Sequence, residues 1–136
     1  MNVTLFVLLV PFMFGLAGLA LDGGQMLVTQ RQIQGVAEGA ARAGAEQLDR
    51  DAARDNPTAP APLDPNLAWT AAADYVAAQP SGLSAIINAN PGQVSVEVTS
   101  GAVSVIFVRA IGFTSPIHVR ATAIAAPRTG IVSATP

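Results

Sequence analysis

The chain has 136 residues and a net charge of −2, and 51% of its residues are hydrophobic while only 12% are charged. That charged fraction is about half of what is usual in soluble proteins. The chain contains neither cysteine nor lysine, which excludes disulfides, thiolate metal sites and Schiff-base chemistry. No cluster of basic residues is present, so the composition argues against a nucleic-acid partner.

Residues 1–21 form an apolar segment without a charged side chain. About 20 apolar residues suffice to cross the ~30 Å hydrocarbon core of a bilayer. A cleavable signal peptide would need a basic residue ahead of the apolar run; none is present, although Gly18-Leu19-Ala20 would supply a cleavage site. A buried core helix would need a larger domain around it than the roughly 80 residues that follow. We therefore predict a retained transmembrane helix, kinked or locally melted at Pro11.

The helical pattern continues beyond Asp22. Apolar residues recur at helical spacing along one face, namely Met26, Leu27, Ile33, Val36, Ala37, Ala40, Ala41 and Leu48. The opposite face is polar and places Glu38 and Arg42 at a spacing that favours an ion pair. Several glycines lower the helix propensity, so we expect this part to be supported by its own domain and by neighbouring subunits. One continuous helix over residues 1–55 would be ~80 Å long.

A proline-rich stretch over residues 56–66 is predicted to be an extended linker. It leads into a small α+β domain over residues 67–136. This domain is expected to begin with a helix that Asn66 caps, and Trp69 and Tyr75 are expected in its core.

Two strands are predicted in this domain because apolar and polar residues alternate strictly over residues 93–99 and again over residues 117–125. Residues 103–113 fit two structures. Their β-branched content favours a strand, whereas their spacing fits a short helix equally well.

Three stretches carry a family resemblance: GLALDGG at residues 18–24, RQIQGVAEGAARAGA at residues 31–45, and AIGFTSPIHVRATA at residues 110–123. They resemble the TadE/TadG-like proteins of tight-adherence (Tad) pilus systems, a branch of the type IV pilin-like proteins. The resemblance implies an α+β, pilin-like fold. Its long N-terminal helix would span the membrane in its first half and be amphipathic in its second. A small C-terminal antiparallel sheet and one or two short helices would complete it, with residues 105–112 helical.

The resemblance implies a structural role in pili and cell adhesion. Such a subunit waits in the cytoplasmic membrane and is then moved into an extracellular filament. Its partners would be copies of itself or other pilin-like subunits, the membrane, and the pilus secretion and assembly machinery. Many type IV pilins carry Glu at mature position five, where this chain has Leu5. The alternative is a monomeric, membrane-anchored envelope protein, an assembly factor or binding module that does not polymerise.

The residues expected to pack against other subunits all lie on the N-terminal helix: Val3, Leu5, Phe6, Leu9, Phe12, Gly15, Leu16, Gly18, Leu19, Gly35 and Gly39. The glycines among them would permit the closest approach of a neighbouring helix. Asp22 and Arg31 are candidates for charges that interact between subunits. A helix-surface acid at the membrane boundary is an equally weighted interpretation of Asp22.

No set of residues in the sequence suggests a catalytic or metal site. His118 is the only histidine, and no serine and acid can be ordered around it for nucleophilic catalysis. Asp49, Asp51 and Asp55 lack the spacing of an EF-hand. We therefore expect no enzymatic activity, no cofactor and no metal.

Overall fold

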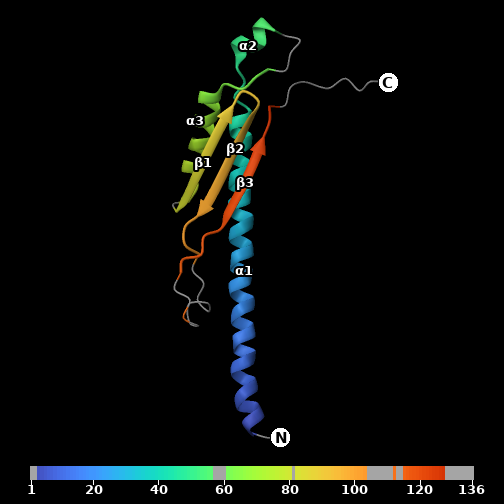
Figure 1. The fold of residues 1–136 in the computed structure, drawn as a ribbon, viewed down its shortest axis with the longest axis vertical. Helices are drawn as coiled ribbons and strands as arrows, with labels where there is room; N and C mark the ends of the chain where they lie inside the picture. Colours follow the sequence, from blue (N-terminus) through green and yellow to red (C-terminus); the bar gives the residue numbers. More distant parts are fainter. Residues whose placement is uncertain (1–2, 57–60, 81, 104–111, 113–114, 128–136) are drawn as a thin grey trace, which may run out of the picture.

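A single long helix carries a small two-layer domain on its C-terminal half (Figure 1). The computed structural model describes residues 3–56, 61–80, 82–103, 112 and 115–127. The elements in chain order are α1 (Val3–Ala45), α2 (Arg50–Asp55), α3 (Pro65–Ala77), β1 (Leu83–Asn90), β2 (Gln93–Ser100) and β3 (Arg120–Ala125). This arrangement confirms the predicted α+β layout of a long apolar helix, short helices and a small antiparallel sheet.

The helix α1 is 43 residues long, which corresponds to about 65 Å. It continues through Pro11 as one element, so the local melting predicted there is not found. Proline removes one backbone donor, and the hydrogen bonds of the turns on either side hold the helix together.

The helix ends at Ala45, so the prediction of one continuous helix to residue 55 is wrong. In the turn that follows, Leu48 forms an isolated bridge with Leu63. Asp49 then caps α2, because its carboxylate accepts hydrogen bonds at 3.1 Å from the backbone N–H groups two and three residues later. A long-range contact and a new N-cap thus interrupt what the local pattern would continue.

The segment predicted as a linker is anchored at its C-terminal end. Leu63 is buried, and its N–H donates to the carbonyl oxygen of Pro91 at 2.9 Å. The next residue, Asp64, caps α3, and Pro65 takes the first helical position, where its missing donor has no cost. The predicted cap, Asn66, therefore lies inside the first turn.

The sheet is antiparallel with the order β1-β2-β3. β2 confirms the first predicted strand, and β3 confirms the second, although it begins at Arg120 rather than at residue 117. β1 is not among the predicted strands, because the apolar Ile86 on its exposed face blurs the alternation. Most of residues 103–113, including the part expected to be helical, lies outside the described residues.

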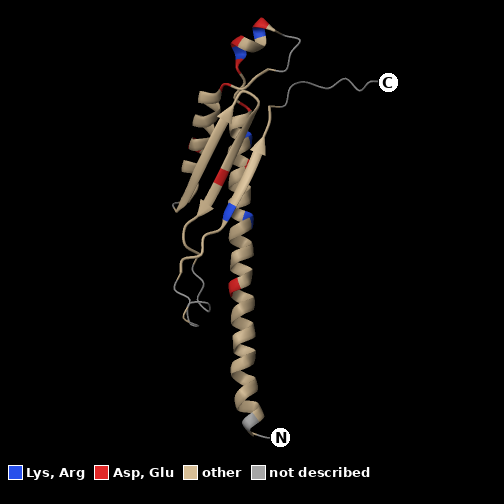
Figure 2. Cartoon of the chain, viewed as in Figure 1, with Lys and Arg blue, Asp and Glu red and all other residues tan. Residues whose placement is uncertain are grey.

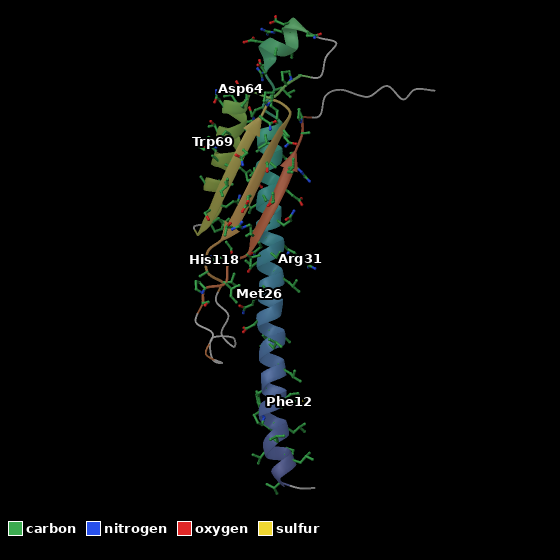
Figure 3. All side chains as sticks on the ribbon, in the orientation of Figure 1. Phe12, Met26, Arg31, Asp64, Trp69 and His118 are labelled. Atoms are coloured by element: carbon green, nitrogen blue, oxygen red, sulfur yellow. The ribbon has the colours of Figure 1, made fainter. Side chains whose placement is uncertain are left out.

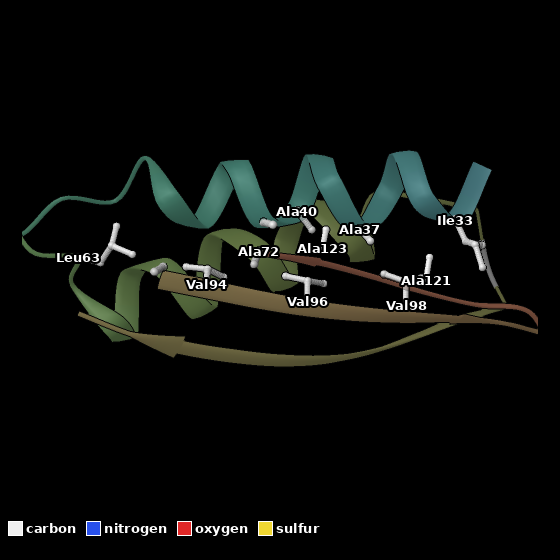
Figure 4. Close-up of a cluster of buried hydrophobic side chains, with 12 residues drawn as sticks. Ile33, Ala37, Ala40, Leu63, Ala72, Val94, Val96, Val98, Ala121 and Ala123 are labelled. Carbon is white, nitrogen blue, oxygen red and sulfur yellow. The ribbon is translucent and has the colours of Figure 1, made fainter. Parts of the chain in front are cut away.

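The core lies between the sheet and the two helices α1 and α3, and it consists mainly of alanine and valine (Figure 4). Its buried members are Ile33, Ala37, Ala40, Ala41, Leu63, Ala68, Ala72, Val94, Val96, Val98, Ala121 and Ala123. The alanines allow the helices to lie close to the sheet, and the branched valines of β2 fill the space between them.

The two aromatic side chains of α3 lie outside this core. Trp69 is 52% exposed and Tyr75 is 38% exposed, so the prediction that they form the core is wrong. Ala68 and Ala72 occupy the buried positions of α3, and the helical period places the neighbouring Trp69 at the margin of the sheet, beside β1. Tyr75 instead covers Gly39 on α1.

Candidate functional site: the projecting part of the long helix

The N-terminal part of α1 projects from the domain with its apolar side chains uncovered (Figures 1 and 3). The exposure of its large hydrophobic side chains ranges from 38% at Val10 to 78% at Val3. Among them are the predicted packing residues Val3, Leu5, Phe6, Leu9, Phe12, Leu16 and Leu19. In the described part of the chain, this is the one helix whose length and composition would allow it to cross a membrane.

The apolar surface extends further than the sequence predicted. Leu27 and Val28 lie beyond Asp22, and both are more than half exposed, at 59% and 56%. Residues 3–28, called the projecting segment below, therefore form an apolar surface ~39 Å long. The acid at residue 22 conceals this continuation from a search for uncharged runs.

Leaving this surface in water would be costly. Burial of one large apolar side chain is worth ~1.5–3 kcal/mol, so covering seven of them amounts to more than about 10 kcal/mol. The whole chain exposes 9767 Å², whereas a compact protein of its mass exposes about 6,600 Å². An apolar surface of this extent marks an interface with a membrane or with another protein.

Four glycines of α1 fall into two groups. A Cβ added at Gly15 or Gly35 would meet no other atom within 4 Å. A Cβ at Gly39 would collide with an aromatic ring of α3, and one at Gly44 would lie 2.9 Å from the carbonyl oxygen of Ala68. Gly39 and Gly44 therefore pack α1 onto its own domain. No contact among the described residues explains Gly15 and Gly35, although glycine in a helix costs ~1 kcal/mol relative to alanine.

Charged residues are sparse along α1 (Figure 2), and the two that are predicted to act between subunits differ in exposure. Asp22 is only 5% exposed, so atoms of its own chain cover it, and Gly18 is buried one turn earlier on the same side. Arg31 is exposed and forms no ion pair with a described residue. Arg31 is therefore the accessible charge of the two, and a role of either between subunits stays a prediction.

A comparison with protein families matches residues 2–51 to the family described as putative Flp pilus-assembly TadE/G-like. Over this segment the chain is similar to that family. No curated protein and no solved structure gives a significant match.

The TadE/G-like segment contains all of α1 and only the first two residues of α2. Every residue predicted to pack between subunits, and both predicted charges, lie within it. The match links this chain to Tad pilus assembly, and the uncovered apolar surface of the same helix fits anchoring in a membrane. The three-stranded sheet lies outside the match.

The residues that were considered above for catalysis or metal binding lie beyond α1 and contact neighbouring parts of the chain. His118 is exposed, and its Nδ1 lies 3.1 Å from the carbonyl oxygen of Ser100. Asp49 caps α2, and a carboxylate oxygen of Asp51 lies 4.0 Å from a guanidinium nitrogen of Arg54. The described residues contain no group of three or more His, Cys, Asp or Glu that could hold a metal ion.

Proposed function

We propose that this chain is a structural subunit of a Tad pilus, a type IV-like filament. The projecting segment would hold the subunit in the membrane and would later pack against other subunits in the extracellular filament. The observation that supports this proposal is the uncovered apolar surface of the TadE/G-like helix.

The distribution of this surface around the helix favours complete enclosure. Every residue from 5 to 14 is exposed, and these residues cover all sides of the helix. A groove on a single partner would cover one stripe only, whereas a helix that is apolar all round is typical of a membrane span or of the centre of a bundle. Lipid and a bundle of identical helices both meet this requirement.

Membrane and filament offer the projecting segment similar surroundings. Lipid tails are about as apolar as leucine side chains, so the hydrophobic effect contributes little to bringing such helices together within a membrane. Assembly would then depend on close packing and polar contacts. Gly15 and Gly35 leave open space in which a neighbouring backbone can approach, and Arg31 offers an accessible charge.

The alternative is a membrane-anchored assembly factor that does not polymerise. Gly39 and Gly44 favour it to some extent, because the subunit uses both to pack α1 on its own domain. Neither function includes a catalytic step, a cofactor, a metal or nucleic acid in our proposal.

A single cysteine in the projecting segment separates the two functions. The chain has no cysteine of its own, and Leu9 is 45% exposed, so Leu9→Cys places one accessible thiol on this helix. We expect filaments sheared from the cell surface to contain the chain, and oxidation of Leu9→Cys in these filaments to give covalent dimers. Ser95→Cys on the central strand is the matched control and should give none.

Recovery of the chain only with membranes, as single copies without Leu9→Cys dimers, would contradict the structural subunit. That result would support the anchored assembly factor. Mass spectrometry of the sheared material would establish that the filaments contain this chain.

A further inference from the structure

Both outer strands of the sheet have a free edge. In the described residues the strand order is β1-β2-β3, and neither β1 nor β3 has a second neighbouring strand. A free edge presents unpaired N–H and C=O groups, which proteins commonly protect with charges or proline. β1 contains neither. The one charge of β3, Arg120, is at its first position and lies 2.8 Å from Glu97 of β2.

Each free edge borders a hollow between the strand and a helix. A cavity of about 320 Å³ lies beside β1, with Trp69 and Ala73 of α3 and Ile87 of β1 in its lining. Two cavities, of about 670 and 410 Å³, lie between α1 and β3. Arg42 of α1 and Ala125 of β3 line both of them. Each edge strand therefore borders open space next to the helix layer.

Each edge strand also carries one exposed isoleucine. Ile86 on β1 is 62% exposed, and Ile124 on β3 is 63% exposed. Their partners on β2 are Glu97 and Ser95, two residues apart, so both isoleucines lie on the outer face of the sheet. The two edges thus present similar uncharged surfaces.

The directions of the strands restrict how two copies can join. β1 and β3 are both antiparallel to β2 and therefore run in the same direction. The N–H of Ser100 donates to the carbonyl oxygen of Val119 at 2.8 Å. In an antiparallel ladder, successive residues point their N–H and C=O groups alternately to the two sides of the strand. Counted from Val119, the N–H and C=O of Thr122 therefore point to the free edge of β3. The same count across β2 places those of Ile87 at the free edge of β1. If β1 of one copy and β3 of another pair in parallel through these groups, the inward side chains of both strands lie on the same face of the joined sheet.

We propose that β1 of one copy pairs in parallel with β3 of the next copy, so that the sheet continues from subunit to subunit. The inference rests on the proposed function, because a shared membrane or filament holds the α1 helices parallel. The strands run roughly along α1 (Figure 1). Symmetric antiparallel pairing of β1 with β1 would therefore point the two helices in opposite directions. A β1-to-β3 contact joins two different surfaces and can repeat along a filament.

The area available to this contact is small. β3 has six residues and is about 20 Å long, and the sheet and helix layers together are about 20 Å thick. The edge face is therefore about 400 Å² per copy, half of the ~800 Å² that each partner buries in a stable dimer. The pairing is weak alone and acts between copies that α1 already holds side by side.

Mixed single-cysteine variants test the pairing in membranes. Asn88 of β1 and Thr122 of β3 are exposed on the outer face. Asn88→Cys and Thr122→Cys together should give a covalent dimer with a short bis-maleimide, whereas either variant alone should not. Ser95→Cys mixed with Thr122→Cys is the matched control and should give no dimer. Adding Ile86→Lys to Asn88→Cys should abolish the dimer, while Ser95→Lys should not.

The outcomes separate this inference from the proposed function. Absence of the mixed dimer in membranes where Leu9→Cys still cross-links overturns the strand pairing and leaves the structural subunit intact. A dimer formed by Asn88→Cys alone also overturns it, in favour of symmetric pairing of β1. Absence of both the mixed dimer and the Leu9→Cys dimer overturns the two proposals together.

Discussion

Replacing glycine by alanine at two positions of α1 is expected to change the stability of the domain in opposite directions. A Cβ at Gly44 would lie 2.9 Å from the carbonyl oxygen of Ala68 and 3.1 Å from a methyl group of Val94. A Cβ at Gly35 would meet nothing within 4 Å. Both residues are within the same helix, but Gly44 is next to its last residue, so its gain in helix propensity is no larger than that of Gly35.

The magnitudes follow from these surroundings. Alanine favours a helix over glycine by ~1 kcal/mol, and Gly35→Ala should retain this gain in the free energy of unfolding. Gly44→Ala gains no more than this and overpacks the contact with α3 and β2, which costs ~1–3 kcal/mol. Its net effect is a loss of up to ~3 kcal/mol. Since 1 kcal/mol shifts Tm by about 4–8 °C in a domain of this size, the Tm values of the variants should differ by roughly 10 °C.

Thermal unfolding of the full chain in detergent measures this difference. Trp69 is the only tryptophan, and it reports on α3 through its fluorescence, while circular dichroism follows the helices. Equal stabilisation by both variants would refute the close packing of α1 on α3 and β2. Gly35→Ala should also lower the yield of filaments despite its higher stability, and unchanged assembly would exclude Gly35 from contacts between subunits.

Three further experiments test the domain. Val96→Ala removes two methyl groups from a fully buried position and should cost ~2 kcal/mol in the same unfolding assay; a negligible cost would mean that β2 is not at the centre of the core. Asp64→Ala removes the acceptor for two N–H groups of α3 and should cost ~1 kcal/mol, whereas Asp74→Ala on the exposed side of that helix is the control and should change little. For Arg120 and Glu97, a double-mutant cycle should give a coupling below ~1 kcal/mol that weakens with added salt, since the arginine side chain is 68% exposed; a large coupling insensitive to salt would contradict this.

Local patterns were sufficient for residues 3–21 of the projecting segment and for β2. An uncharged run of about 20 residues indicates a membrane-length helix whatever surrounds it. The alternation of residues 93–99 likewise reflects one buried and one outward face of a strand. Two of the three stretches that carried the family resemblance, residues 18–24 and 31–45, lie on α1 and within the matched residues 2–51.

Other features depend on residues far apart in the sequence. The end of α1 at Ala45 follows from the bridge between Leu48 and Leu63, and β1 exists because β2 provides its ladder. Whether a glycine of α1 packs against the domain or faces open space depends on which part of α1 faces α3 and β2. Spacing along a helix places small residues on a face, but the partner on that face is known only once α3 and the sheet have packed against it.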